Sequence, residues 1–229
     1  MQHIKTFFNL FFPTACLGCS SLLQPEENGI CTGCRHNIPL TNQHLYLENE
    51  TMTKFYGRLP LEHASALMFF HKKGIVQELI HNLKYRGHQE VGTLIGTWYG
   101  SELKSCNALK DLDYIIPIPL HKKRLQKRGY NQVTAFGTTL SAVLNVSFEE
   151  RILKRRKYSK TQTFKNLLNR NEIKEHTFEV TFSEMHHNKH FLLIDDVLTT
   201  GATLEAAGKA ILEIPGAKIS IVCIAMSHQ

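Results

Sequence analysis

The run Phe191-Leu-Leu-Ile-Asp-Asp-Val-Leu-Thr-Thr-Gly-Ala-Thr203 says more about the architecture of this chain than any other segment. Its first four residues are continuously apolar, as is typical of a strand that is buried on both faces of a parallel sheet. From Thr203 onward, apolar residues recur at the spacing of a helix that faces a core. The run therefore predicts a buried strand at 191–194, a tight turn, and the N-terminus of a helix.

The turn between this strand and helix has the composition of an anion-binding loop. A helix N-terminus offers free backbone N–H groups and the positive end of the helix dipole, so we expect a phosphate there. Asp195 and Asp196 would repel that anion, and we expect them to bind neighbouring hydroxyls, such as a sugar diol, or a hydrated Mg²⁺. The predicted phosphate-binding residues are Thr199, Thr200, Gly201, Ala202 and Thr203.

This segment resembles, position for position, the signature of the type I phosphoribosyltransferases, which bind 5-phosphoribosyl 1-pyrophosphate (PRPP). The resemblance implies the parallel-sheet α/β fold of those enzymes, with Asp195 and Asp196 as the catalytic pair and Mg²⁺ bound together with PRPP. The alternative is an ordinary parallel strand whose acids cap the following helix. That alternative accounts for one carboxylate but not for the Thr-Thr-Gly-Ala-Thr run.

The length and composition of the chain suit one substantial core with a small appendage, since 229 residues with 42% hydrophobic content can bury that much surface. The longest apolar runs are shorter than the roughly 18 residues that span a bilayer, so we expect no transmembrane segment. The stretch Phe7–Phe12 follows a single lysine and leads into Pro13, which favours a short amphipathic helix over a signal peptide. We expect a cytoplasmic protein, and peripheral membrane contact stays open.

Four cysteines near the N-terminus form two CxxC knuckles, at Cys16, Cys19, Cys31 and Cys34. Four thiolates at this spacing suit tetrahedral Zn²⁺ in a structural role, because four sulfur ligands leave no open coordination position. Disulfides are the competing interpretation, but a cytoplasmic chain stays reduced, and this segment is too small for a core of its own. The pattern therefore predicts a small zinc-binding module with four cysteine ligands.

The predicted organisation is a zinc-finger module at 1–40, a linker at 41–58 and a phosphoribosyltransferase-like domain at 59–229. In the large domain, strand patterns alternate with helix patterns, which predicts a parallel sheet covered on both faces. Strands are expected at 64–70, 114–119, 177–182, 191–194 and 219–225, and helices at 74–85, 91–103 and 131–145.

The formal net charge of +7 is concentrated in two acid-free basic segments, a loop at 120–130 and a second segment at 154–170. Such segments are usually solvated faces, but beside a sugar-phosphate site they favour a polyanionic ligand. The first follows a strand that should end at the same sheet edge as Asp195, which places Arg124 and Arg128 opposite the acids. The second is too polar to be core, and we expect it to be a mobile flap.

At this point the chain resembles the ComF (ComF/GntX) family of bacterial phosphoribosyltransferase-like proteins, which includes the ComFC competence proteins. The similar elements are the CxxC pairs, Leu83-Lys-Tyr-Arg-Gly87, the basic segment Pro117–Gln132, and the segment Arg156–Arg170. The resemblance covers nearly the whole chain and implies a role in DNA uptake during natural transformation. It also implies a pyrophosphate and flexible-loop set made of Lys84, Arg86, Arg124, Arg128, Arg156, Thr161 and Gln162.

Three functions stay open on this sequence. The first is a phosphoribosyltransferase in which PRPP loses pyrophosphate to an unknown acceptor, whose pocket must come from residues before Asp113 or from the zinc module. The second is a single-stranded-DNA binder, with Tyr130, Tyr158 and Phe164 interleaved for stacking and with peripheral contact to inner-membrane DNA-uptake machinery. The third is a PRPP sensor that binds its ligand without turnover.

Overall fold

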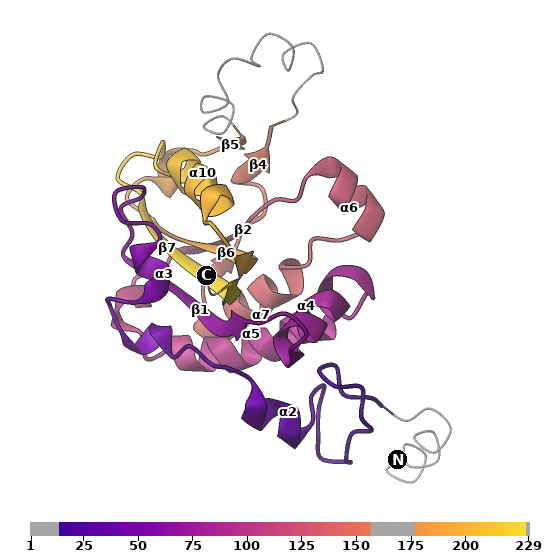
Figure 1. The fold of residues 1–229 in the computed structure, drawn as a ribbon. Coiled ribbons are helices and arrows are strands. Elements are labelled where there is room, and N and C mark those ends of the chain that lie inside the picture. Colours follow the sequence, from indigo (N-terminus) through magenta and orange to yellow (C-terminus); the bar gives the residue numbers. More distant parts are fainter. Residues whose placement is uncertain (1–13, 157–176, 228–229) are drawn as a thin grey trace.

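The computed structural model describes residues 14–156 and 177–227 (Figure 1). The predicted amphipathic helix at Phe7–Phe12 lies outside the described residues. So does most of the predicted flap, including Tyr158, Thr161, Gln162 and Phe164.

Five parallel strands form the central sheet, in the order β1-β7-β6-β2-β3, so the predicted parallel α/β fold is confirmed. The strands are β1 (His63–Phe70), β2 (Tyr114–Pro117), β3 (Ser147–Phe148), β6 (His190–Leu198) and β7 (Lys218–Ser227). Residues 191–198 of the run Phe191–Thr203 lie in β6, which is between β7 and β2 at the centre of the sheet. This position explains its apolar sequence, because side chains 191–194 are 0% exposed.

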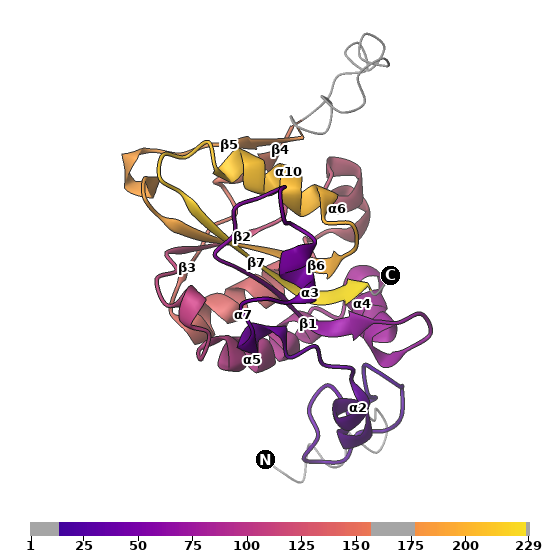
Figure 2. The same ribbon diagram turned by 60° about the vertical axis from the view of Figure 1, so that its left-hand side comes forward.

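Helices cover both faces of the sheet (Figures 1 and 2). On one face lie α4 (Ile75–Tyr85), α5 (Glu90–Leu103) and α7 (Thr134–Leu144), and on the other lies α10 (Ala202–Ile211). Successive side chains of β6 alternate between these layers, so Leu192 packs in the core beneath α4, α5 and α7, whereas Phe191 packs in the core beneath α10. The sheet therefore separates two apolar cores.

The basic segment expected as a loop at 120–130 contains a helix, α6 (Lys122–Arg128). Lysine, arginine, leucine and glutamine are good helix formers, and they outweigh the repulsion among the cations. The His121 side chain accepts a hydrogen bond from the backbone N–H of Lys123 at the start of α6, and Gly129 ends it with a φ of 80°. The cations therefore project from a regular helix.

The remaining elements are short. β4 (Leu153–Arg155) pairs with β5 (Phe178–Val180) in a separate antiparallel ladder, so the strand predicted at 177–182 is present. The helical turns outside the large layers are α2 (Thr32–Asn37), η1 (Gln43–Leu45), α3 (Glu50–Thr53), η2 (Asn107–Leu109) and η3 (Glu184–His186).

The segment expected as a linker at 41–58 packs against the sheet. The amide oxygen of Gln43, a buried residue, accepts hydrogen bonds from the backbone N–H of Ala66 at 3.1 Å and from the Thr51 hydroxyl at 2.7 Å. Phe55 is 1% exposed and belongs to the core beneath α10. Polar residues in this segment therefore satisfy buried backbone groups, which is why its sequence lacks the periodicity of a core element.

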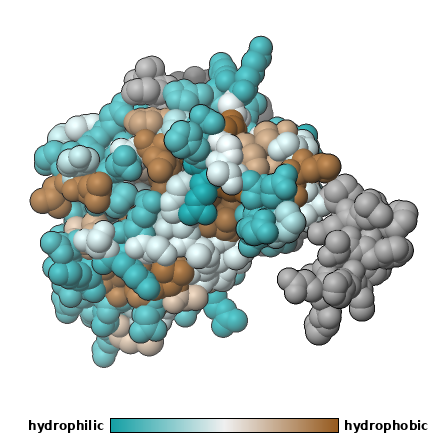
Figure 3. All heavy atoms as spheres, turned by 90° about the horizontal axis from the view of Figure 1, so that it is seen from below, coloured by the Kyte–Doolittle hydropathy of each residue, from teal (hydrophilic) through white to brown (hydrophobic). Residues whose placement is uncertain are grey.

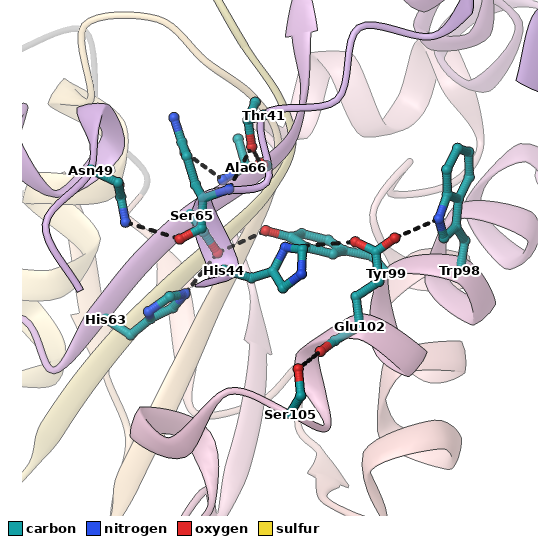
Figure 4. A network of polar contacts seen from close by, with 11 residues as sticks. Thr41, His44, Asn49, His63, Ser65, Ala66, Trp98, Tyr99, Glu102 and Ser105 are labelled. Carbon is teal, nitrogen blue, oxygen red and sulfur yellow. Dashed lines mark hydrogen bonds and ion pairs between the residues drawn. The ribbon is translucent and has the colours of Figure 1, made fainter. Parts of the chain in front are cut away.

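A buried polar network joins the same segment to β1 and α5 (Figure 4). The Tyr99 hydroxyl donates a hydrogen bond to Ser65 Oγ at 2.7 Å, and Ser65 Oγ lies 2.8 Å from His63 Nε2. On α5, Glu102 accepts a hydrogen bond from the Trp98 indole at 2.7 Å and lies 3.6 Å from His44 Nδ1. The network pins β1 to its covering helix layer through polar as well as apolar contacts.

The buried histidine of this network predicts a pH dependence of stability. Burial, together with the nearby His44 and His190, lowers the pKa of His63 to about 4. An unfolded histidine titrates near pH 6.5, so between these values the unfolded chain binds a proton that the folded chain does not. Folding is therefore expected to weaken by about 1.4 kcal/mol per pH unit as the pH falls from 6.5 toward 4.

Urea unfolding of the wild type and of His63→Gln at several pH values between 7.5 and 4.5 would check this expectation. The variant should be less stable at pH 7.5 but should lose less stability on acidification. His71→Gln, which changes an exposed histidine, is the control and should follow the wild type. Parallel pH profiles for the wild type and His63→Gln would contradict the prediction.

The surface seen from below mixes hydrophilic side chains with separate apolar patches (Figure 3). Within the ranges 14–156 and 177–227, the structure contains no helix with the length and apolar character needed to cross a bilayer.

Candidate functional site

An open cavity of about 900 Å³ lies where β6 and β2 end. Side chains from several parts of the chain line it: the ends of β1 and β7, α4, the segment from β2 through Gln132, β4, and the end of β6 with the turn that leads to α10. The predicted site residues that line this cavity are Lys84, Arg124, Arg128, Asp195, Asp196, Thr199 and Thr203. The fold thus brings the acid pair, part of the predicted phosphate loop and cations of the basic segment to one place.

The predicted phosphate loop forms the start of α10. Gly201 is the N-cap residue, with a φ of 76°, and has no side chain to cap the helix; the Thr200 hydroxyl oxygen accepts a long hydrogen bond of 3.4 Å from the backbone N–H of Ala202. Thr199, Thr200, Ala202 and Thr203 are all exposed. A recess of about 40 Å³ is lined by Asp195 and residues 197–204. This helix N-terminus therefore has the dipole and the accessible backbone that an anion requires.

Two residues ahead of β1 hold the phosphate loop in place. Phe55 packs so close to Gly201 that a Cβ atom there would lie 2.9 Å from the Phe55 ring. Arg58 donates a hydrogen bond to the backbone oxygen of Thr200 at 2.9 Å and forms an ion pair with Glu205 of α10 at 2.5 Å. Sequence reasoning missed both residues, because they come from a segment with no recognisable pattern.

This packing predicts a specific effect of Gly201→Ala. Alanine at a positive φ costs about 1–2 kcal/mol of backbone strain, and the clash with Phe55 adds about 1–3 kcal/mol as overpacking. Chemical denaturation should show both losses. Gly57→Ala is the matched control, because Gly57 also has a positive φ of 68° but a Cβ atom added to it would meet nothing within 4 Å. Equal losses in the two variants would show that the Phe55 contact contributes nothing.

Asp196 is buried at 6% exposure, and both of its carboxylate oxygens have partners. Lys84 Nζ lies 2.6 Å from Oδ1, and Gln132 Nε2 donates to Oδ2 at 2.5 Å. The amide oxygen of Gln132 in turn accepts a hydrogen bond from Arg128 at 2.5 Å. This chain of contacts, from Arg128 through Gln132 and Asp196 to Lys84, links the basic helix to α4 across the acid pair.

The sequence did not predict two features of this chain of contacts. The sequence predicts Lys84 as a pyrophosphate ligand, and here its ammonium pairs with a carboxylate. Gln132 is not among the predicted site residues, although it stands in the Arg-Gly-Tyr-Asn-Gln element that follows the basic segment. A glutamine has no charge to mark it in a sequence, so only the fold reveals its role.

Asp195 differs from its neighbour in its surroundings. It lines the cavity, and its Oδ1 accepts a hydrogen bond from the backbone N–H of Asp196 at 2.8 Å. Burial, followed by the negative charge of Asp196, raises the pKa of Asp195 to about 7. A positive charge arriving beside it would favour its ionised form, so this carboxyl group is suited to respond to a cation or to a developing positive charge.

The predicted cations divide into two groups. Arg124 and Arg128 line the cavity, and Arg155 of β4 lines it as well, although the sequence does not predict it as a site residue. Arg156 points elsewhere, with its Nε 3.8 Å from Glu179, because successive side chains along an extended strand face opposite sides. Arg86 also lies outside the cavity lining and instead pairs with Glu78 on α4.

The four N-terminal cysteines converge as the sequence predicts, with all four Sγ atoms within 4.8 Å of one another. Cys19 and Cys31 have their Sγ atoms 3.7 Å apart, which is too far for a disulfide but suits two ligands of one tetrahedral Zn²⁺. Backbone N–H groups of Gly18 and Cys31 donate to Cys16 Sγ at 3.4 and 3.2 Å. The donor set thus fits a structural zinc ion with four cysteine ligands.

The cysteine module is joined to α4 rather than separate from it. The amide of Asn82 donates a hydrogen bond to the backbone oxygen of Leu17 at 2.7 Å. Cys16, Leu17 and Cys34 belong to the same apolar core as Val76 of α4. The module and the cavity therefore share one helix.

Comparison with known proteins adds independent information. The family described as phosphoribosyl transferase domain matches residues 134–229, which include β6, α10 and β7. Competence protein F of Haemophilus influenzae is 27% identical over 221 residues, covering 92% of this chain and 96% of that protein. Competence protein ComFC of Bacillus subtilis is 26% identical over 211 residues, covering 84% of this chain and 81% of that protein.

Two further matches are partial. The DNA utilization protein YhgH of Escherichia coli (strain K12) is 25% identical over 149 residues, covering 64% of this chain and 65% of that protein. A crystal structure of adenine phosphoribosyltransferase aligns with a TM-score of 0.39 and 17% identity, covering 66% of this chain and 74% of that chain. The strand order and the family match identify the fold, and the structural alignment is too weak to add to them.

Proposed function

We propose that this chain, a phosphoribosyltransferase-like protein of the ComF family, binds PRPP together with Mg²⁺ in the 900 Å³ cavity and acts in DNA uptake. The observation that carries the proposal is the convergence of the acid pair, the start of α10 and the cations of α6 on one cavity. The relatives named as competence and DNA utilization proteins support the role in DNA uptake.

Each part of PRPP has a chemically suitable partner. The start of α10 would bind the 5-phosphate through its backbone N–H groups and the hydroxyls of Thr199 and Thr203. Asp195 and Asp196 would accept hydrogen bonds from the ribose hydroxyls, and Arg124 would bind the pyrophosphate. Mg²⁺ prefers carboxylate, phosphate and water oxygens, so this end of the cavity also suits the metal that accompanies pyrophosphate.

The same arrangement suits phosphoribosyl transfer as the reaction. When the bond between the ribose C1 and pyrophosphate breaks, the electron pair leaves with pyrophosphate and positive charge develops on the ribose. Carboxylates held beside that charge stabilise it, and cations stabilise the leaving group. Positioning and electrostatics would therefore supply most of the catalysis, without a dedicated general base.

A second candidate function rests on a separate observation. The helix α6 exposes cations that do not line the cavity, Lys122 and Lys127, beside those that do. A row of exposed cations on one helix suits the phosphates of single-stranded DNA, whose binding would depend strongly on salt. PRPP and DNA would then share only part of the basic helix.

Calorimetric titration of the zinc-loaded protein with PRPP, with and without Mg²⁺, would test the proposal. The sharpest comparison is Arg124→Gln with Lys127→Gln, since both side chains are exposed on α6 and both changes remove one charge. Of these two side chains, Arg124 lines the cavity and Lys127 does not. Arg124→Gln should weaken PRPP binding roughly 10- to 100-fold, the value of a lost charge-assisted hydrogen bond, whereas Lys127→Gln should leave it nearly unchanged.

The same pair of variants tests the second function. A single strand that follows the basic helix should lose affinity to a similar extent in both variants, with the salt dependence reduced by about one ion in each. Absence of PRPP binding by the wild type would overturn the main proposal and leave the DNA-binding function. Equal weakening of PRPP binding by both variants would show general electrostatic attraction rather than contact in the cavity.

A further inference from the structure

The segment that follows α3 runs along the helix that begins at the phosphate loop. Phe55 lies against Gly201, the N-cap residue of α10. Leu59 lies against Gly208 on the same helix, where an added Cβ atom would be 2.7 Å from the leucine side chain. Both Phe55 and Leu59 are buried in the core beneath α10. Arg58, which stands between them, is therefore anchored from both sides next to this helix.

Arg58 uses most of its N–H groups on partners in or near the phosphate loop. Its Nη1 donates hydrogen bonds to the backbone oxygens of Thr200 at 2.9 Å and of Lys54 at 2.8 Å. Its Nε and Nη2 donate to one carboxylate oxygen of Glu205, at 2.9 and 2.5 Å. The guanidinium also lies 5.7 Å from the centre of the Phe55 ring. A planar guanidinium with this many partners is held in one orientation.

The bond from Arg58 to Thr200 orients one peptide group of the loop. In a planar trans peptide, the carbonyl of one residue and the N–H of the next residue point in opposite directions. Because Arg58 holds the carbonyl of Thr200, the N–H of Gly201 points away from Arg58. Within the part of the chain that the structure describes, this N–H has no hydrogen-bond partner. It can therefore donate to an anion in the recess that residues 197–204 line.

Arg58 also offsets a negative charge close to the phosphate loop. Glu205 stands in the first turn of α10, and its side chain is partly buried. Burial alone would raise the pKa of Glu205, but the hydrogen bonds and charges of Arg58 and Lys209 outweigh it and lower the pKa below its ordinary value. Glu205 is therefore an anion. Without a compensating cation, it would repel a phosphate at the start of the same helix.

We infer that Arg58 is a positioning residue of the phosphate site, which orients the N–H of Gly201 for a phosphate ester and neutralises Glu205. This inference rests on the proposed function, which supplies the ligand, the 5-phosphate of PRPP. Arg58 would act through the loop and not by contact with the phosphate. Its loss should therefore weaken the binding of a phosphate ester at α10 and spare the binding of pyrophosphate by the cations of α6.

Calorimetric titration with two probes, ribose 5-phosphate and pyrophosphate with Mg²⁺, would test this selectivity. Arg58→Gln should weaken the binding of ribose 5-phosphate about 10-fold or more, the value of a lost charge-assisted hydrogen bond, and should leave pyrophosphate binding nearly unchanged. Lys209→Gln is the matched control, because Lys209 also pairs with Glu205, at 3.2 Å. That variant removes the same charge but keeps the bond from Arg58 to Thr200, so it should lose about 3-fold or less.

Two further measurements separate orientation of the loop from charge. Inorganic phosphate should shift the amide NMR resonance of Gly201 in the wild type, and the shift should be smaller in Arg58→Gln at the same phosphate concentration. The double variant Arg58→Gln/Glu205→Gln removes both opposite charges and should regain only part of the affinity for ribose 5-phosphate. Full recovery would overturn the positioning of Thr200, since charge balance alone would then be sufficient.

The outcomes distinguish this inference from the proposed function. Equal binding of ribose 5-phosphate by the wild type and Arg58→Gln, or equal weakening of both probes in Arg58→Gln, would overturn the role of Arg58 and leave PRPP binding intact. A phosphate-induced shift of the Gly201 amide that depends on Arg58, in a protein that does not bind PRPP, would keep this role and overturn the proposed function. A wild type that binds neither inorganic phosphate nor ribose 5-phosphate nor PRPP would overturn both.

Discussion

Replacing Asp195 and Asp196 together with asparagine should weaken the binding of PRPP and Mg²⁺ by about 100-fold or more. Each carboxylate would accept a charge-assisted hydrogen bond from a ribose hydroxyl, and such bonds contribute about 1.5–3 kcal/mol each. Asparagine keeps the size of the side chain but removes the charge, so the loss reports electrostatics rather than shape. Calorimetric titration of wild type and variant with PRPP would measure it.

The control for this prediction must separate ligand binding from damage to the fold. Asp196→Asn also removes the charge that pairs with Lys84, which lies 2.6 Å away. Asp113→Asn removes the partner of another lysine, Lys189, at 2.8 Å and outside the cavity. That variant should bind PRPP like the wild type. Unchanged PRPP binding by the double variant would show that the acid pair is not part of the ligand site.

Removal of zinc should be the largest perturbation of stability. A structural Zn²⁺ held by four thiolates contributes on the order of 10 kcal/mol of apparent binding free energy, much of which is folding free energy. The cysteine module also shares its core with α4, so its loss would expose apolar surface of the large domain. We expect a strong chelator, or Cys34→Ser, to lower the melting temperature by roughly 10 °C or more.

Elemental analysis and thermal unfolding would check this expectation. The purified protein should contain one zinc ion per chain, and Cys34→Ser should contain less. Cys106→Ser is the matched control, since Cys106 is also buried but lies outside the four-cysteine cluster. That variant should keep its zinc. A metal-free protein that melts at the same temperature as the zinc-loaded one would contradict a structural role for the ion.

The sequence was most informative where one local pattern determined both structure and chemistry. β6 and the start of α10 follow from an apolar run and a threonine-rich turn, and the cysteine cluster follows from spacing alone. Those features depend on neighbouring residues, which a sequence displays directly. The predicted parallel sheet followed from the alternation of such patterns along the chain.

The remaining site features depend on tertiary contacts that no local pattern records. Phe55 and Arg58 reach the phosphate loop from a segment that contributes no periodic pattern, and Gln132 joins two charged residues without carrying charge itself. The family resemblance implies Arg156 as a member of the pyrophosphate and flexible-loop set, but the arginine that lines the cavity is its neighbour Arg155, because successive side chains along an extended segment face opposite sides. The sequence thus predicted that arginines would reach the site, but not which arginine lines the cavity or which residues contact the phosphate loop.

The helix shared by the cysteine module and the cavity has a geometric consequence. With 11 residues, α4 is about 16 Å long at about 1.5 Å per residue. The module packs closely against it at Ile75, its first residue, where a Cβ atom added to Gly18 would lie 2.9 Å from the side chain, and is hydrogen-bonded to it at Asn82, while Lys84 near its end contacts Asp196. A tilt of only about 4° about its start would move Lys84 by about 1 Å, a displacement that can cost about 100-fold in rate when it misaligns reacting groups. A metal ion bound by the four cysteines would therefore help to fix the position of Lys84 in the cavity, although the two sites are at opposite ends of α4.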